Sequence, residues 1–249
     1  MTAGVVLPVF AGLIGACAGS FAATAALRSL RGEKALAGRS RCDGCGQALG
    51  FAATTPIISF AVLRGACARC GSRIDSAHVA GEAAGATLAG AAFWLVPPAE
   101  AALTAALGLV LVAASIIDQR TQRLPNLLTL AVALLCLGLA ALNGQVLVGI
   151  AAATITFVLL EGLRRGFLRL RGHAGLGSGD VKLLCALALW LGVATPWAIA
   201  LAALVGLLVA MVTKPTDGRI AFGPLIAGGA LMVGLAVDGG VLPAEWALA

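Results

Sequence analysis

Long blocks of apolar residues are the feature that most limits how this chain can fold. Leu, Ala, Val and Gly recur in blocks of roughly 17–25 residues, the length that a helix needs to cross a ~30 Å hydrocarbon core. Hydrophobic residues make up 60% of the chain and charged residues only 11%, against about 25% charged residues in soluble domains. We therefore expect an all-α polytopic membrane protein with about eight transmembrane helices, near residues 4–27, 78–96, 100–117, 126–142, 146–162, 181–195, 197–213 and 221–237.

The basic residues fall in alternate loops between these blocks. Of the 17 Lys and Arg residues, eight lie in 28–73, two in 120–123, five in 164–182 and two in 214–219. Basic residues accumulate in cytoplasmic loops, so this pattern predicts that residues 28–73 are cytoplasmic and that both termini lie outside. The net charge of +6 then reflects topology and contact with membrane lipid, and nucleic acid is not an expected partner. The first ten residues contain no basic residue, so we expect the first helix to be retained and not cleaved as a signal peptide.

The long polar segment contains two pairs of cysteines. Cys42 and Cys45 lie in CDGC, Cys67 and Cys70 lie in CARC, and 21 residues separate the pairs. Four thiolates in two C-x2-C pairs suit tetrahedral zinc. Disulfides are the alternative, but the cytoplasm is reducing, and iron can take the place of zinc in recombinant protein. Four protein ligands leave no open coordination position, so we expect a structural zinc site.

Two aspartates lie at predicted membrane boundaries. Asp118 ends the third apolar block in SIIDQRTQRLPN, and Asp180 opens the sixth in GLGSGDVKLL. A carboxylate near the bilayer is disfavoured, by up to ~3 kcal/mol at mid-depth, and is therefore a candidate functional group. Each also has a structural alternative. Asp180 could cap the amino terminus of a helix, and Asp118 could be a solvated residue at a helix end.

Taken together, the two aspartates indicate hydrolytic chemistry. The charge pattern places both on the cytoplasmic face, although 62 residues separate them in the sequence. Two carboxyl groups that face each other do not both ionise readily, so one can keep its proton while the other activates a shared water. Such a pair can hydrolyse an amide without a metal ion. Gly177 and Gly179 lack side chains and would let an extended substrate backbone come close to the Asp180 carboxyl.

With these motifs the sequence resembles the type IV prepilin peptidases, membrane aspartyl proteases of the GxGD type. The GxGD stretch alone is weakly specific, whereas the ordered set of motifs is highly specific and covers nearly the whole chain. The set consists of GSF at 19–21 with Arg28, the cysteine pairs with PIISF at 56–60 between them, Glu82, IIDQRTQRLPN, GLGSGDVKLL and AFGP at 221–224.

The resemblance implies that Asp118 and Asp180 form the catalytic dyad and that zinc is structural. The implied substrates are type IV prepilins and the pseudopilins of type II secretion, cut after a glycine at the cytoplasmic face of a bacterial inner membrane. Many members with the tetra-cysteine loop also methylate the new amino terminus with S-adenosylmethionine. These members commonly have asparagine at the position of Ala23.

The sequence thus predicts three parts. Residues 1–27 form the first transmembrane helix, 28–77 a cytoplasmic zinc-binding domain, and 78–249 a membrane-embedded peptidase core. A peptidase without methyltransferase activity is one alternative, and an inactive zinc-stabilised scaffold is another. A proton-coupled transporter is the third alternative, but it would place its acids deeper in the helices and often carries an internal repeat.

Overall fold

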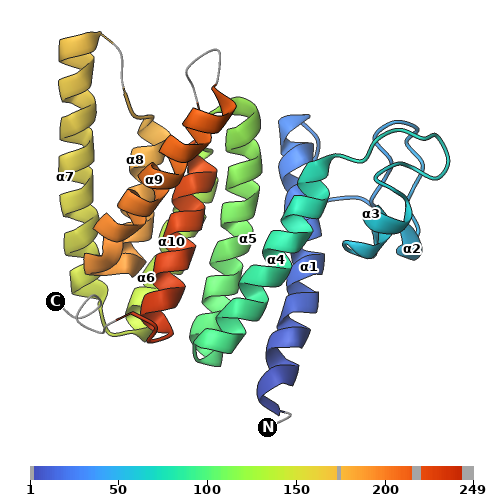
Figure 1. The fold of residues 1–249 in the computed structure, drawn as a ribbon, viewed down its shortest axis with the longest axis horizontal. Helices are drawn as coiled ribbons and strands as arrows, with labels where there is room; N and C mark the ends of the chain where they lie inside the picture. The colour runs from blue at the N-terminus through green and yellow to red at the C-terminus, as the bar shows by residue number, and fades with distance from the viewer. Residues whose placement is uncertain (1–2, 173–174, 215–219, 243–249) are drawn as a thin grey trace. The chain divides into compact units, whose positions relative to one another are not determined.

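Each predicted apolar block coincides with a helix (Figure 1). The computed structural model describes residues 3–172, 175–214 and 220–242, and the chain divides into two compact parts, Met1–Trp94 and Leu95–Ala249. The helices that begin in the first part are α1 (Ala3–Leu30), α2 (Phe51–Thr54), α3 (Ile58–Val62) and α4 (Ser76–Leu95). Those of the second part are α5 (Pro98–Thr121), α6 (Asn126–Leu142), α7 (Val146–Arg171), α8 (Ser178–Leu191), the 3-10 turn η1 (Gly192–Ala194), α9 (Thr195–Thr213) and α10 (Gly223–Asp238).

The helices are long and apolar enough for a polytopic membrane protein. Four stretches of the described residues could cross a membrane by length and composition, and two shorter apolar helices, α6 and α10, accompany them. The four stretches are Gly4–Leu30, Pro98–Thr121, Val146–Arg171 and Ser178–Thr213. The all-α membrane class is therefore confirmed, whereas the count of eight spans and the three domain boundaries stay predictions.

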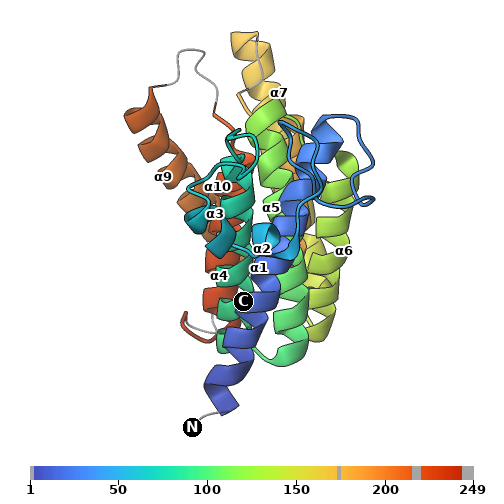
Figure 2. The same ribbon diagram turned by 90° about the vertical axis from the view of Figure 1, so that its right-hand side faces the viewer.

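The last of these stretches is interrupted at η1. Gly192 has a φ of 52° and a ψ of −125°, a backbone conformation that only glycine adopts readily. The chain turns there, so that α9 leads back toward the end at which α8 begins (Figure 1). Pro196 follows in the first turn of α9, where its missing N–H costs no helical hydrogen bond. Figure 2 shows the last turns of α9 standing out from the rest of residues 95–242.

Helix α8 forms the core of the second part. It packs against α6, α7 and α10, and Leu183 and Leu187 on it are fully buried. Close approach to α7 depends on Gly149, because a Cβ there would collide with the Leu189 carbonyl oxygen. Small residues at such crossings let helix backbones approach closely in an apolar environment. The helix that carries Asp180 is therefore held on several sides.

A polar contact joins α8 and α10 at the end away from Asp180. The Trp190 Nε1–H donates a hydrogen bond to Asp238 Oδ2 at 2.8 Å. The Trp190 ring also covers Gly234, where any Cβ would collide with it. An indole N–H that is buried normally needs such an acceptor. The contact fixes the far ends of the two helices against each other.

In the first part, α1 and α4 pack through two pairs of glycines. Gly15 and Gly19 on α1 face Gly81 and Gly85 on α4, so that a Cβ on Gly15 or Gly19 would collide with a carbonyl oxygen of α4. Each pair has the G-x-x-x-G spacing, which places both glycines on one side of a helix. The two backbones therefore lie in direct contact.

We expect Gly85→Ala to destabilise the protein by about 1–3 kcal/mol, because its Cβ would overlap the Gly15 carbonyl oxygen. Gly90→Ala on the same helix is the matched control, since its nearest neighbour would be an ordinary contact at 3.5 Å. Alanine favours a helix over glycine by up to about 1 kcal/mol, so Gly90→Ala should be neutral or stabilising. Unfolding in detergent, followed by circular dichroism, measures both. Equal stability of the two variants would contradict the close packing.

Candidate active site and metal centre

The two cysteine pairs occupy two small hairpins with the same hydrogen bonds. In the first, the N–H of Cys42 donates to the Gln47 carbonyl and that of Gly46 to the Cys42 carbonyl, both at 2.9 Å. In the second, the equivalent bonds run from Cys67 to Ser72 and from Gly71 to Cys67, again at 2.9 Å. Isolated antiparallel bridges close the hairpins, Arg41 with Ala48 and Ala66 with Arg73. The turn glycines have φ values of 71° at Gly46 and 70° at Gly71, which favour glycine.

The hairpins bring the four cysteines into one cluster. The Sγ atoms of Cys42, Cys45, Cys67 and Cys70 all lie within 4.8 Å of one another. The Sγ atoms of Cys42 and Cys70 are 3.7 Å apart. Tetrahedral coordination with metal–sulfur bonds of about 2.3 Å requires sulfur atoms about 3.8 Å apart. The cluster therefore has the size of a four-thiolate metal site.

Ser72 supports this cluster. Its hydroxyl lies within hydrogen-bonding distance of two sulfurs, 3.3 Å from Cys42 and 3.1 Å from Cys70. This hydroxyl is the main reason that the pKa of Cys42 is lowered to about 6, and it also lowers the pKa of Cys70. The thiolate is the form that binds a metal ion. Ser72 thus favours the charge state that coordination needs.

Asp118 lies near the carboxyl end of α5 and is buried, with 5% of its surface exposed. Its Oδ2 accepts a hydrogen bond of 2.8 Å from the backbone N–H of Gly223, at the start of α10. A buried carboxylate is costly unless it accepts hydrogen bonds, and this bond provides one. The solvated helix-end position considered for Asp118 is therefore wrong, because the side chain points into the bundle.

Asp180 lies in the first turn of α8 and is half-buried. It lies close enough to Asp118 for the charge of Asp118 to act on its carboxyl group. Gly177, not Asp180, occupies the helix-cap position, and no side chain caps this helix. The fold thus brings together two carboxyl groups that are far apart in the sequence.

The two glycines before Asp180 have different surroundings. A Cβ on Gly177 would lie 2.8 Å from Asp180 Oδ2, so the missing side chain makes room for this carboxylate. A Cβ on Gly179 would lie 3.2 Å from the Cβ of Leu124. A role for either glycine in the approach of a substrate backbone stays a prediction.

An open cleft of about 540 Å³ lies where α5 ends and α6 begins. It is lined by Ile117, Thr121, Arg123, Leu124, Pro125 and Asn126. Ile117 precedes Asp118 on α5, and the Cβ of Leu124 lies 3.2 Å from the place of a Cβ on Gly179, so the cleft adjoins both carboxyl-bearing segments. Lys182 Nζ donates to Asn126 Oδ1 at 3.0 Å and thereby ties α8 to the rim. This cleft is large enough for a short extended stretch of peptide.

Two charged residues of the first part have partners that sequence reasoning did not assign. Glu82 is buried, and its carboxylate accepts hydrogen bonds of 2.7 Å from Ser20 Oγ and from the Ile57 N–H. Ile57 has a φ of 62°, which is unusual for a β-branched residue, and Glu82 stabilises that turn. Arg28 is also buried and donates to the carbonyls of Ala37 and Arg39 at 2.8 Å. The sequence did offer one signal for both residues, because each is a charged residue within an otherwise apolar helix and would need a polar partner there.

Comparison with known proteins agrees with these features. The model of the bacterial peptidase A24 N-terminal domain matches residues 13–96, and that of the type IV leader peptidase family matches residues 105–211. The prepilin leader peptidase/N-methyltransferase of Neisseria gonorrhoeae is 33% identical over 199 residues, which are 75% of this chain and 67% of the relative. The chain belongs to the type IV leader peptidase family.

Other members of the family match over similar lengths. The prepilin leader peptidase/N-methyltransferase of Burkholderia pseudomallei strain 1026b is 38% identical over 202 residues, and the match spans 77% of this chain but 65% of the relative. A type 4 prepilin-like proteins leader peptide-processing enzyme of Escherichia coli is 31% identical over 205 residues, covering 78% of this chain and 74% of the relative. No solved structure shows a significant match.

We expect the double variant Cys42→Ser, Cys45→Ser to lose its bound metal, because it lacks half of the thiolates of the cluster. The loop should then become sensitive to protease, since a structural metal can contribute on the order of 10 kcal/mol to folding. Cys17→Ser on α1, outside the cluster, is the control and should keep its metal. Elemental analysis of the purified proteins measures the metal content. Wild-type protein without metal, with four thiols open to alkylation, would contradict the site.

Proposed function

We propose that this protein is a membrane aspartyl endopeptidase that removes the leader peptide of type IV prepilins and of pseudopilins. The observation that carries the proposal is the proximity of Asp118 and Asp180, together with an open cleft lined by Ile117, the residue before Asp118. The names of the relatives, which include prepilin leader peptidase, support the substrate class. The match to the Burkholderia relative covers just under two thirds of that protein.

Asp118 and Asp180 act together on one water molecule. One carboxylate removes a proton from the water, whose oxygen adds to the carbonyl carbon, while the other carboxyl group protonates the carbonyl oxygen of the scissile bond. The proton taken from the water then passes to the leaving amine as the C–N bond breaks, and the second carboxylate takes its proton back from a hydroxyl of the intermediate. The pair titrates as a unit, so its proton belongs to both groups. The substrate lies in the cleft formed by the end of α5 and the start of α6, with its scissile bond over the carboxyl pair.

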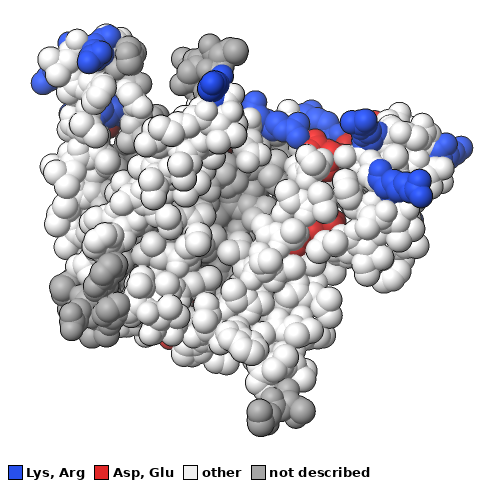
Figure 3. Space-filling model, viewed as in Figure 1, with Lys and Arg blue, Asp and Glu red and all other residues white. Residues whose placement is uncertain are grey.

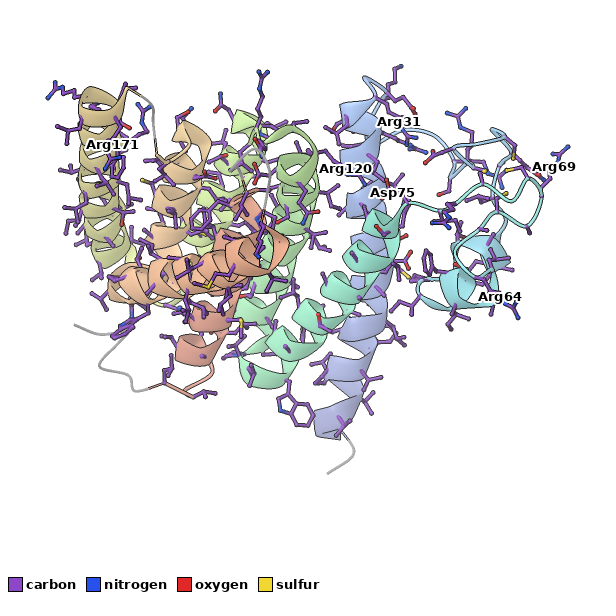
Figure 4. All side chains as sticks on the ribbon, turned by 45° about the horizontal axis from the view of Figure 1, so that its top comes forward. Arg31, Arg64, Arg69, Asp75, Arg120 and Arg171 are labelled. Carbon is purple, nitrogen blue, oxygen red and sulfur yellow. The ribbon has the colours of Figure 1, made fainter. Side chains whose placement is uncertain are left out.

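The active site faces the cytoplasm, and both termini lie on the periplasmic side of the inner membrane. In the second part, the described Lys and Arg side chains gather at the end where α5 and α7 finish (Figure 3). Figure 4 shows Arg120 and Arg171 at these two helix ends. Asp118 lies at the same end of α5, and basic residues mark the cytoplasmic side of a membrane helix. Cleavage at this level leaves the basic leader in the cytoplasm.

The cysteine cluster holds a structural zinc ion. Four thiolates at tetrahedral spacing favour zinc and leave no open position for a substrate. The ion stabilises the loop between α1 and α4, which holds the two cysteine hairpins and the short helices α2 and α3. No catalytic step passes through it.

The protein also methylates the amino terminus that cleavage exposes, with S-adenosylmethionine as the methyl donor. The names of several relatives, which include N-methyltransferase, support this second activity. Ala23 is fully buried against α4. If Gly81 on α4 carried a Cβ, that atom would lie 3.0 Å from the Cβ of Ala23. Position 23 therefore contributes to helix packing here, and it offers no polar group to the donor.

We expect Asp118→Asn and Asp180→Asn each to reduce prepilin cleavage by about 10²–10⁴-fold or more, because general acid–base catalysis contributes this much. Glu100→Gln is the control, since Glu100 lies in the first turn of α5, at the other end of the helix that carries Asp118. Mass analysis of a purified type IV prepilin measures cleavage, and circular dichroism checks the helix content. Full activity of either aspartate variant would remove the dyad from the mechanism.

For methyl transfer, we expect isotope-labelled S-adenosylmethionine to label the new amino terminus of processed pilin. The label should be missing from pilin incubated with Asp180→Asn, because this variant does not expose that terminus. Pre-cleaved pilin, added to the same variant, separates the two activities and should still be labelled. Cleavage by the wild type without label on any pilin would leave a peptidase alone.

A further inference from the structure

The start of α10 makes direct contact with Asp118. The N–H of Gly223 donates to Asp118 Oδ2 at 2.8 Å, in a buried environment and across 105 residues of sequence. The first N–H groups of a helix have no partner within the helix and can donate outward. Pro224 follows and has no N–H of its own. The Gly223 amide is therefore placed to hold one oxygen of the carboxylate.

The missing side chain of Gly223 matters as much as its N–H. A Cβ at this position would lie 2.7 Å from Asp118 Oδ2 and 3.1 Å from its Cγ. Its backbone φ is not in the left-handed region, so the backbone conformation would accept alanine. The carboxylate itself is what excludes a side chain here. The three nearest atoms that a Cβ on Gly223 would meet all belong to Asp118, which gives the glycine a specific steric relation to this side chain.

Asp180 has the same kind of neighbour. A Cβ on Gly177 would lie 2.8 Å from Asp180 Oδ2, much as a Cβ on Gly223 would lie 2.7 Å from Asp118 Oδ2. Gly177 precedes the first residue of α8, as Gly223 is the first residue of α10. Each carboxyl group thus lies against a glycine at the amino-terminal start of a helix, and the two helices pack against each other.

We propose that Gly223 is a positioning residue of the peptidase. Its N–H fixes the plane of the Asp118 carboxyl group through Oδ2, which leaves the other oxygen for the water shared with Asp180. Its lack of a side chain allows this carboxyl group to sit within reach of Asp180. The proposal rests on the proposed peptidase function. It gives the AFGP motif a role in catalysis beyond starting a helix.

The test compares Gly223→Ala with Gly228→Ala, which lies on the same helix with nothing within 4 Å of its Cβ position. A displacement of about 1 Å at a reacting group can cost 10²-fold in rate, so Gly223→Ala should lower kcat for prepilin cleavage by about that factor. Its KM should stay within about twofold, because the cleft residues that bind the peptide are unchanged. Gly228→Ala should cleave at the wild-type rate.

A second measurement reports the contact without any substrate. Gly223→Ala should lower the melting temperature in detergent, and most of this loss should disappear when Asp118→Ala is also present. The reason is that the second change removes the Cγ and Oδ2 atoms that the new Cβ meets. The same loss in both backgrounds would mean that the introduced methyl group disturbs something other than the carboxylate, and would overturn the proposal.

The outcomes separate this proposal from the function on which it rests. If wild-type protein cleaves prepilin and Gly223→Ala keeps its kcat, the positioning role is wrong and the peptidase stands. If Gly223→Ala raises KM and leaves kcat unchanged, the role is again wrong, because the residue then acts in binding. If the wild type cleaves no prepilin, the peptidase fails and the positioning role fails with it, whatever the melting temperatures show.

Discussion

The burial of Asp118 is the constraint on which the rest of the second part depends. A carboxylate inside an apolar helix bundle must accept hydrogen bonds or lose its charge, and its own helix has no N–H left to offer near its carboxyl end. The partner comes from the first residue of α10, far along the chain. The start of α10 must therefore meet the end of α5, and this meeting sets where the acid pair can form.

Close helix approach makes the arrangement possible. Glycine allows contacts between backbones at α1 with α4 and at α7 with α8, and it makes room for the carboxylates at Gly177 and Gly223. In an apolar solvent the hydrophobic effect cannot drive helices together, so tight packing between small residues carries much of the association. The same residue type thus serves packing in one place and chemistry in another. The difference is whether the missing Cβ faces a carbonyl oxygen or a carboxylate.

Much of this architecture could be predicted from the sequence because its causes are local. Apolar length placed the helices, and C-x2-C spacing placed the cysteine cluster, since neighbouring residues determine both. The turn between α8 and α9 lies at Gly192, a few residues before Pro196. The partners of Glu82 and Asp118 could not be predicted, because each contact joins segments 25 to 105 residues apart and depends on how helices pack. Gly179 shows the same limit, since its neighbour Leu124 belongs to the α5–α6 connection.

Helices α8 and α10 are joined by a hydrogen bond near their carboxyl ends and lie against the two aspartates at their amino ends. Asp180 lies in the first turn of α8, and the amide that donates to Asp118 lies at the start of α10. The Trp190–Asp238 hydrogen bond joins the two helices about 15 Å farther along α8 and about 22 Å farther along α10, at ~1.5 Å per residue. The Trp190–Asp238 hydrogen bond therefore limits how far these two helices can separate, at a point remote from the carboxyl groups. A change that breaks this hydrogen bond would free the far ends of the two helices without touching the residues around the acids.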